Sequence, residues 1–354
     1  MGDGCDRSRG CRRHGRPSFV LKTRETELQR GSLFSRAVGW TAALVLCSGA
    51  VQAQVQPYPQ RPIVLVVPFG TGNIADNQGR MIARSLAAAL GQPVVVENKP
   101  GAGGSIGTEF VARAPADGYT LLYGTHGTQA ANSALYATGR IHPAQDLRGV
   151  HSLFRQSTVL VTPASRPWRT LKDMLDAARV APGHLTYASS GVGTQTHLAA
   201  AKFQGATQVT FTHVPYNNQS SMTDLLAGTV DLSFSYAESV LQHLEGGRLR
   251  ALAINGKTRP SALLDVPTVG EAGYPGAALE GWSGVFVPRG TPDAIVARLA
   301  KEIAKATEAS DVKASMAKIG SYPMGLSDTA FQSFVEAEVP RWREIVKSAG
   351  AEAR

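Results

Sequence analysis

Continuous apolar runs alternate with segments of helical periodicity over most of the chain, and few folds accept that pattern. The run Pro62–Phe69 (PIVLVVPF) has no polar interruption, which is typical of a strand buried on both faces of a sheet. The next segment carries apolar residues at helical spacing over Ile74–Leu90, and Gly91 marks its end. Such alternation predicts an α/β fold with mainly parallel strands. Further strands are expected at 93–98, 119–124, 157–163, 184–189, 208–214, 230–235 and 249–255, and further helices at 105–114, 171–180, 195–203 and 221–227.

The strand at Ser157–Pro163 (STVLVTP) opens a second series of these elements. With 354 residues, the chain is long enough for two domains of about 100–200 residues each. It has no internal repeat and no Gly/Ser-rich linker, so we expect two α/β lobes joined by ordered strands, with a cleft between them. The end of the chain returns to helices, and Thr291-Pro292 is predicted as the N-cap and first residue of one of them.

The first 53 residues have the three-part pattern of a secretory signal peptide. Nine Lys and Arg stand against four acidic residues there, followed by the apolar run Ala37–Ala50 and the cleavage site Val51-Gln52-Ala53. The apolar run is shorter than the ~20 residues that a membrane-spanning helix needs. We therefore predict export to the periplasm with cleavage near Ala53. Lipidation at Cys47 is the alternative, although Leu46 is bulkier than a lipoprotein site favours, and the long basic segment leaves the true translation start open.

Composition after Ala53 excludes several classes of site. Cys5, Cys11 and Cys47 all precede Ala53, so the exported protein has no disulfide, thiol nucleophile or thiolate metal site. The formal charge of +9 falls to +4 once the +5 of the first 53 residues is subtracted, and no basic run follows Arg36. The stretch Gly101–Gly107 has Ile where a dinucleotide loop needs its third glycine. We expect no cofactor, no metal and no nucleic-acid partner.

Four loops each follow a predicted strand and precede a predicted helix. They are loop one (Phe69–Asp76), loop two (Thr125–Ala130), loop three (Ser189–His197) and loop four (Val214–Ser221). In open α/β sheets, ligands bind beyond the carboxyl ends of strands, where helix N-termini present unpaired N–H groups. None of the four loops contains Lys or Arg, so a highly charged anion lacks its usual bidentate partner. Backbone amides and helix dipoles can still hold a small carboxylate or a neutral ligand.

Turn chemistry within these loops defines the candidate site. Asn73 and Thr194 are predicted N-caps, Asp76 can cap back, and Ser221 with Asp224 has capping-box spacing. No close Ser–His–acid or HExxH spacing is present, so no catalytic residue is predicted. The predicted ligand-binding residues are Phe69, Gly70, Thr71, Gly72, Asn73, Asp76, Thr125, His126, Ser189, Gly191, Gly193, Thr194, Gln195, His197, Tyr216, Ser235 and Tyr236.

Some of these residues have two interpretations. Asp76 is either a structural cap or a ligand contact, and His126 is either a ligand contact or a loop surface residue. His197 is expected to be a neutral hydrogen-bonding or packing residue, because a helix N-terminus disfavours the charged imidazolium. Tyr216 is expected to pack, with its hydroxyl at the edge of the cleft.

Several long segments resemble the extracytoplasmic receptors of tripartite tricarboxylate transporters, the Bug receptors. They include RPIVLVVPF, LGQPVVVENKPGAGGSIGTEFVARAPADGYTLLYGT, LTYASSGVGTQTHLAAAKFQ and HVPYNNQSSMTDLLAGTVDLSF, and the similarity runs from Tyr58 to about Gly350. The resemblance implies a two-lobed Venus-flytrap fold, type II-like, with crossing strands near Thr158–Pro163 and Trp282–Val287. It places lobe 1 at 54–157 plus 285–354 and lobe 2 at 158–284.

The resemblance also implies a function. A monomeric receptor would hold a small carboxylate through the backbone amides of loops one, two and three and through bridging water, and would deliver it to a two-subunit inner-membrane permease. The chain departs from the family where PFAPGGSTD becomes PFGTGNIAD, and where HVPYKG becomes HVPYNN. Many members have Asp where this chain has Ser235, followed by Tyr236. Without that acid a ligand ammonium would be buried beside hydroxyls alone, so we expect a ligand without an amino group.

Two other functions were weighed against transport. The same fold could couple ligand binding to a sensor kinase or another signalling partner, and a neighbouring gene for a histidine kinase rather than a permease pair would favour that. An enzyme on this fold lacks a defensible nucleophile–base pair. The sequence does not identify the ligand.

Overall fold

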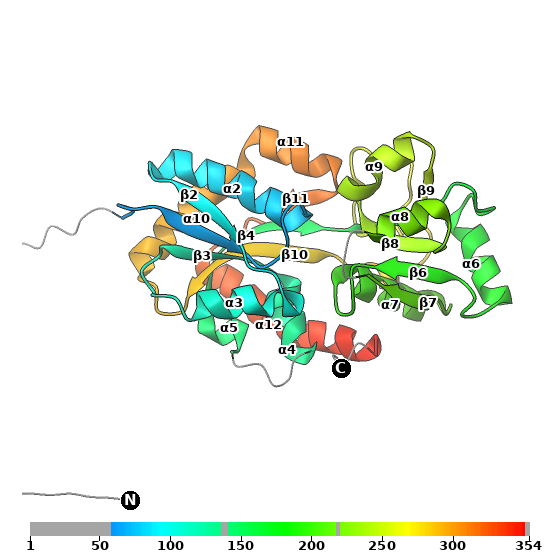
Figure 1. Ribbon diagram of the computed structural model, residues 1–354, viewed down its shortest axis with the longest axis horizontal. Coiled ribbons are helices and arrows are strands. Elements are labelled where there is room, and N and C mark those ends of the chain that lie inside the picture. The colour runs from blue at the N-terminus through cyan, green and yellow to red at the C-terminus, as the bar shows by residue number, and fades with distance from the viewer. Residues whose placement is uncertain (1–57, 136–140, 217–219, 351–354) are drawn as a thin grey trace, which may run out of the picture. The chain divides into compact units, whose positions relative to one another are not determined.

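The computed structural model describes residues 58–135, 141–216 and 220–350, and its strands form two sheets (Figure 1). The predicted signal peptide, its cleavage site and the three cysteines lie outside these residues. The first sheet, in the order β11-β4-β10-β3-β1-β2, contains β1 (Ile63–Val67), β2 (Val94–Asn98), β3 (Thr120–Thr125), β4 (Leu147–Gln156), β10 (Gly281–Pro288) and β11 (Ser321–Pro323). The second, in the order β7-β6-β8-β5-β9, contains β5 (Thr158–Pro163), β6 (Thr186–Ser189), β7 (Thr212–Pro215), β8 (Leu232–Tyr236) and β9 (Leu249–Asn255).

Helices connect most of these strands. The described α-helices are α2 (Ile74–Leu90), α3 (Ser105–Ala112), α4 (Asn132–Leu135), α5 (Pro143–Asp146), α6 (Leu171–Val180), α7 (Gln195–Thr207), α8 (Ser220–Ala227), α9 (Ala237–Glu245), α10 (Asp293–Glu308), α11 (Ser310–Lys318) and α12 (Asp328–Ser348). Short 3-10 turns occupy Ala102–Gly104 and Pro275–Ala277, and a π-helical turn occupies Gly127–Ala131. None of the described helices is long and apolar enough to span a membrane.

Both sheets are mixed, which corrects the prediction of mainly parallel strands. β1 pairs with β2 and β3 in parallel, as β6 does with β7 and β8. β10 is antiparallel to β3 and β4, and β5 is antiparallel to β8 and β9. These two strands come directly after the chain changes sheet. Each enters its new sheet at the edge where the parallel strands end, so it runs in the opposite direction to those strands.

The alternation of side chains along β1 gives the first sheet two different apolar faces. Ile63 and Leu65 pack in one cluster with residues of α2 and α10, whereas Val66 belongs to another cluster with residues of α3 and α12. Figure 1 shows α2 and α12 on opposite sides of the sheet. The unbroken apolar run of β1 is therefore explained by burial on both faces.

The chain changes sheet at Ser157 and again between Asn255 and Gly281. The predicted crossing segments are β5 and the interior of β10, and each of them pairs within a single sheet. Both changes of sheet are tightly packed. A methyl group added at Gly256 would lie 2.4 Å from Ser157 Cβ, and one at Gly281 would lie 2.0 Å from Gln195 Oε1.

The four predicted helix starts have different outcomes. Thr194 holds the N-cap position of α7, but its side chain makes no capping hydrogen bond. Asn73 is the N-cap of α2, and its side-chain oxygen accepts a hydrogen bond from the Asp76 amide, which confirms the prediction. Thr291 is not a cap: its hydroxyl donates to the Pro288 carbonyl at 2.8 Å, and the extended Pro292 (ψ 140°) holds the N-cap position of α10.

The predicted capping pair of loop four is also wrong. α8 begins at Ser220, so Ser221 lies inside the helix. The carboxylate of Asp224 instead accepts a hydrogen bond from the Tyr216 hydroxyl at 2.7 Å.

Candidate functional site

Loop one is organised from within by the buried carboxylate of Asp76. Its Oδ2 accepts hydrogen bonds from the Gly72 amide at 2.9 Å and from Arg80 Nε at 3.0 Å, and its Oδ1 accepts one from Asn98 Nδ2 at 2.9 Å. These donors hold the pKa of Asp76 below its usual range, against the opposing effect of burial. With both oxygens engaged by Gly72, Arg80 and Asn98, Asp76 acts as a structural cap of loop one.

The tip of loop one remains open. Gly70 and Thr71 are exposed, and Gly72 adopts a positive φ of 83° that favours glycine. Asn98, at the end of β2, steadies the loop because its Nδ2 donates to the Phe69 carbonyl at 3.0 Å. Asn98 and Arg80 were not predicted, since each sits on an element outside the loop.

Loop two is buried against the last helix. The Thr125 amide donates to the Thr128 hydroxyl at 2.9 Å, which closes a tight turn. The ring of His126 stacks on Trp342 of α12 with centroids 4.3 Å apart, and the Trp282 amide lies 3.4 Å from its Nδ1. Burial lowers the pKa of His126 to about 4, so the ring is neutral at pH 7. Of the two interpretations of His126, the exposed surface role is excluded.

Loop three is held by its own polar side chains. The Thr194 hydroxyl donates to the Gly191 carbonyl at 2.7 Å, and the Ser190 amide donates to Thr196 Oγ1 at 2.9 Å. The Gly193 amide donates to Nδ1 of His197 at 3.1 Å, so His197 acts as a neutral acceptor, as predicted.

A stack of rings lies beneath loop three. His197 and His213 are parallel with centroids 4.3 Å apart, and Tyr187 stacks on the other side of His213 at 4.7 Å. His213 Nε2 lies 2.6 Å from Ser189 Oγ, a juxtaposition that the sequence analysis missed because the two residues are on adjacent strands. Burial, reinforced by His197, lowers the pKa of His213 to about 4, which makes it a poor general base. The pair therefore positions the loop.

The remaining predicted residues are Tyr236, Ser235 and Tyr216, and each has a different hydrogen-bond partner. The Tyr236 hydroxyl donates to Gln195 Oε1 at 3.2 Å, which joins the end of β8 to the start of α7. Ser235 lies beside Ser233, with their hydroxyl oxygens 2.8 Å apart. Tyr216 is directed toward Asp224 and away from this group.

Glutamine side chains connect the two sheets below the loops. Gln195 Nε2 donates to the Gln156 carbonyl at 3.1 Å, at the point where β4 leads into β5. Gln78 Nε2 lies 3.5 Å from Gln156 Oε1, and the Tyr123 hydroxyl donates to Gln78 Oε1 at 2.5 Å. We name Gln78, Tyr123, Gln156, Gln195 and Tyr236 the amide network. The sequence offers one indication of the role of Gln78, because it is a polar residue among the apolar positions of a predicted helix.

Loops from the two sheets approach one another around this network. A methyl group on Gly281 would meet both Gln195 Oε1, at 2.0 Å, and His126 Cε1, at 2.7 Å. One on Gly193 would lie 2.4 Å from Leu135 of α4. Loops two and three therefore converge. Loop one leads into α2, whose Gln78 belongs to the same network and whose Asn77 Nδ2 donates to Glu238 Oε1 of α9 at 2.8 Å. The described residues contain no group of three His, Cys, Asp or Glu that could hold a metal ion.

The neutral buried histidines predict that acid destabilises the protein. The pKa of His126 is 6.5 in an unfolded chain and about 4 in the folded protein, so the unfolded state binds the proton first as the pH falls. Its contribution is intact above pH 6.5 and is lost between pH 6.5 and 4. We expect His126→Gln to reduce the fall in unfolding free energy between pH 7.5 and 5.0 by about 1–2 kcal/mol, measured by urea denaturation. The exposed His184→Gln is the control, and an unchanged pH dependence in His126→Gln would contradict the assignment.

Sequence comparisons identify relatives over nearly the whole described chain. The family model described as the tripartite tricarboxylate transporter family receptor matches residues 79–351. Protein BugT of Bordetella pertussis is 34% identical over 307 residues, which cover 86% of this chain and 94% of BugT. A protein from the tcbD-tcbE intergenic region of a Pseudomonas species is 37% identical over 307 residues, covering 86% of this chain and 91% of that protein.

Solved structures agree in fold. Rpa4515 of R. palustris, determined with adipate, has a TM-score of 0.78 and 35% identity, covering 84% of this chain and 100% of its own. The periplasmic binding protein BugD has a TM-score of 0.75 and 32% identity, with coverage of 84% and 100%. MatC of Rhodopseudomonas palustris, with bound malate, has a TM-score of 0.73 and 31% identity, with coverage of 82% and 100%.

These relatives are binding proteins, and their fold is the two-lobed one predicted from the sequence. The loops converge on a network of glutamine and tyrosine side chains. The chain thus belongs to the tripartite tricarboxylate transporter family of receptors, and it is a periplasmic solute-binding protein rather than an enzyme.

Proposed function

We propose that this receptor binds a small carboxylate without an amino group between its lobes and delivers it to a two-subunit inner-membrane permease. The observation that carries the proposal is the convergence of loops one, two and three on the amide network without a Lys or Arg of their own. The lobes would be 54–157 plus 285–354 and 158–284. Two relatives of the same fold were determined with adipate and with malate, which are small dicarboxylates.

Helix N-termini supply the donors for a carboxylate in this arrangement. The first-turn amides of α2 and α7 have no acceptor within their own helices, and both helices begin inside the converging loops. In α2 the Asp76 amide is capped by Asn73, which leaves the amides of Ile74 and Ala75 as the proposed donors. Each N-terminus contributes about 0.3–1 kcal/mol to an anion at its end. We propose that the predicted residues of loops one, two and three, together with Tyr236, contact the ligand. Asp76 is the exception, because its carboxylate holds loop one in place.

Ser235 and Tyr236 would select the rest of the ligand. Within the described residues around them, their hydrogen-bond partners are neutral groups, Ser233 and Gln195. A ligand ammonium beside Ser235 and Tyr236 would find hydroxyl and amide oxygens, because the carboxylate of Glu238 is exposed and accepts a hydrogen bond from Asn77 of α2. A buried charge without a charged partner is costly.

A ligand panel tests the proposed class directly. Adipate, malate and succinate are each expected to raise the melting temperature, because a ligand at 100 times its dissociation constant adds about 2.7 kcal/mol of apparent stability. Aspartate and glutamate are the matched amino-bearing probes and are expected to bind more weakly by calorimetry. Stabilisation by glucose or AMP but by none of the carboxylates would refute the ligand class, and tighter binding of aspartate than succinate would refute the selectivity.

A glycine pair tests whether loop three forms the site. Gly193 has φ 78° and faces Leu135, whereas Gly228 has φ 76° with nothing near its missing Cβ. Both alanine variants carry about 1–2 kcal/mol of backbone strain. Only Gly193→Ala adds a methyl group against Leu135 of α4, so that the side chain or loop three must shift. We therefore expect it to weaken carboxylate binding at least about tenfold while Gly228→Ala and Thr194→Ser keep wild-type affinity. Equal affinity of the two alanine variants would place the ligand elsewhere.

Export remains a proposal because the structure does not describe residues 1–57. We infer that the signal peptide is cleaved near Ala53, so that the periplasmic protein begins near Gln54. Intact mass spectrometry of the protein from a periplasmic extract is expected to give the mass of residues 54–354. A lipid adduct on Cys47, or a retained N-terminus, would show that processing differs.

A signalling role on the same fold is the second candidate. Genes for a permease pair beside this one support transport, and a sensor-kinase gene there supports signalling.

A further inference from the structure

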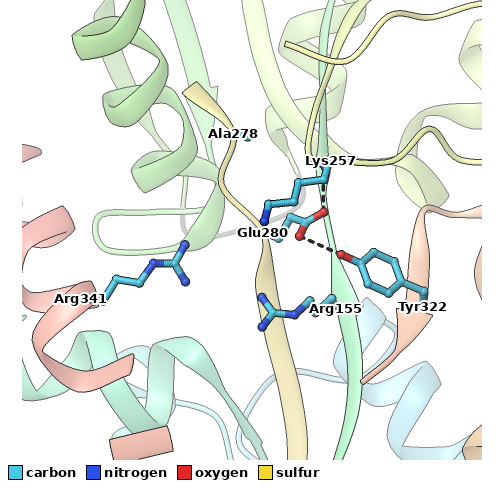
Figure 2. Close-up of a pocket in the computed structure, with 6 residues that line it drawn as sticks. All are labelled: Arg155, Lys257, Ala278, Glu280, Tyr322 and Arg341. Atoms are coloured by element: carbon cyan, nitrogen blue, oxygen red, sulfur yellow. Dashed lines mark hydrogen bonds between the residues drawn. The ribbon is translucent and has the colours of Figure 1, made fainter. Parts of the chain in front are cut away.

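A second, cationic pocket lies apart from the converging loops. It has a volume of about 380 Å³ and is lined by Arg155, Lys257, Ala278, Glu280, Tyr322 and Arg341 (Figure 2). None of the residues predicted to bind the carboxylate lines it. We call it the Arg155 pocket.

The alternation of side chains along β4 separates this pocket from the amide network. The Arg155 guanidinium lies over the ring of Phe334 of α12, 5.1 Å from its centroid. The next residue, Gln156, is directed toward Gln78 of α2 on the other face of the sheet. The two neighbouring side chains therefore serve different sites.

The acidic side chains near the pocket are already engaged. Glu280 is buried, and its two oxygens accept hydrogen bonds from the Lys257 amide at 3.0 Å and the Tyr322 hydroxyl at 2.8 Å. Glu338 pairs with Arg341 at 2.7 Å and also accepts from the indole N–H groups of Trp282 and Trp342.

The cations are in excess of these acids. Over the residues that the structure describes, no carboxylate oxygen lies within 4.0 Å of the Arg155 guanidinium or the Lys257 ammonium. Figure 2 shows the guanidinium groups of Arg155 and Arg341 both directed into the space between them. On α7, burial and, to a smaller extent, the charge of Arg341 lower the pKa of Lys202.

We propose that the Arg155 pocket binds a small, multiply charged oxyanion, a phosphate or a di- or tricarboxylate. Two planar guanidinium groups and an ammonium around one cavity match an anion with several oxygens, because Arg donates paired hydrogen bonds to such groups. This inference does not rest on the proposed function, since the pocket shares no residue with the proposed carboxylate site.

The position of the pocket gives the anion a role. Arg155 lies two residues before Ser157, and Lys257 and Glu280 lie at the two ends of the second change of sheet. An anion that contacts all of them links both segments about which the lobes would rotate. Its binding would shift the equilibrium between lobe arrangements, and would thereby act as an effector of ligand affinity.

Inorganic phosphate and citrate are the probes, with sodium chloride at equal ionic strength as the reference and no other ligand present. We expect a saturable rise in melting temperature and a calorimetric dissociation constant for at least one probe. Lys257→Gln and Arg341→Gln, both at exposed positions, are expected to weaken that binding about tenfold. Arg343→Gln on the same helix is the matched control and should bind as wild type, since Arg343 does not line the pocket.

The outcomes separate the two sites. Tighter binding of phosphate identifies a phosphate-type anion, and tighter binding of citrate identifies a polycarboxylate. Citrate binding that is lost in Gly193→Ala but kept in Lys257→Gln belongs to the loops, and it overturns the second site if phosphate binding is also unchanged in Lys257→Gln. No saturable effect of either probe, or equal affinity in Lys257→Gln and Arg343→Gln, overturns it as well, whereas the carboxylate proposal is decided by the loop variants alone.

Discussion

Where the chain passes from one sheet to the other, buried amide groups lie close together, and each needs a hydrogen-bond partner there. Gln156 ends β4, and its carbonyl accepts a hydrogen bond from Gln195, while its side chain reaches Gln78. A buried amide without a partner costs about 1–3 kcal/mol, so this network favours the arrangement in which every member is satisfied. Gly256 and Gly281 allow that arrangement, because a side chain at either would meet Ser157 or Gln195.

Hydrogen bonds hold the backbone of loops one and three in place. Asp76 fills loop one with three hydrogen bonds, and Thr194, Thr196 and His197 fix loop three through the backbone of the glycines. The polar side chains of these turns are largely used to position the backbone. What is left for a ligand is the backbone itself, with helix N-termini behind it. Because the side chains position the backbone and the backbone amides remain for the ligand, loops without Lys or Arg can form an anion site.

The two proposed sites use opposite chemistry on either side of β4. The loops present dipoles in a neutral, buried setting, in which His126 and His213 are kept uncharged by burial. The Arg155 pocket presents full charges next to solvent, where Lys257 and Arg341 are exposed. Adjacent residues of β4, Arg155 and Gln156, contribute to the two sites, so both proposed sites share a single strand.

The sequence by itself determined the elements that follow from local periodicity and turn chemistry. The buried run of β1, the helix capped by Asn73 and ended by Gly91, and the exact span of α6 all follow from residues within a few positions of each other. The family resemblance added the two-lobed fold. The four loops were visible because glycines and capping residues follow apolar runs.

Only the tertiary structure decided which polar residues meet. The ten-residue strand β4 was not predicted, because Arg148, His151 and Ser152 interrupt its apolar pattern, although Arg148 is neutralised by Asp293 and Asp328 far along the chain. The Ser189–His213 contact, the amide network and the Arg155 pocket likewise join residues tens to hundreds of positions apart. No local pattern encodes such pairings, because a polar residue's burial and partners depend on which strands become neighbours and on where the chain changes sheet.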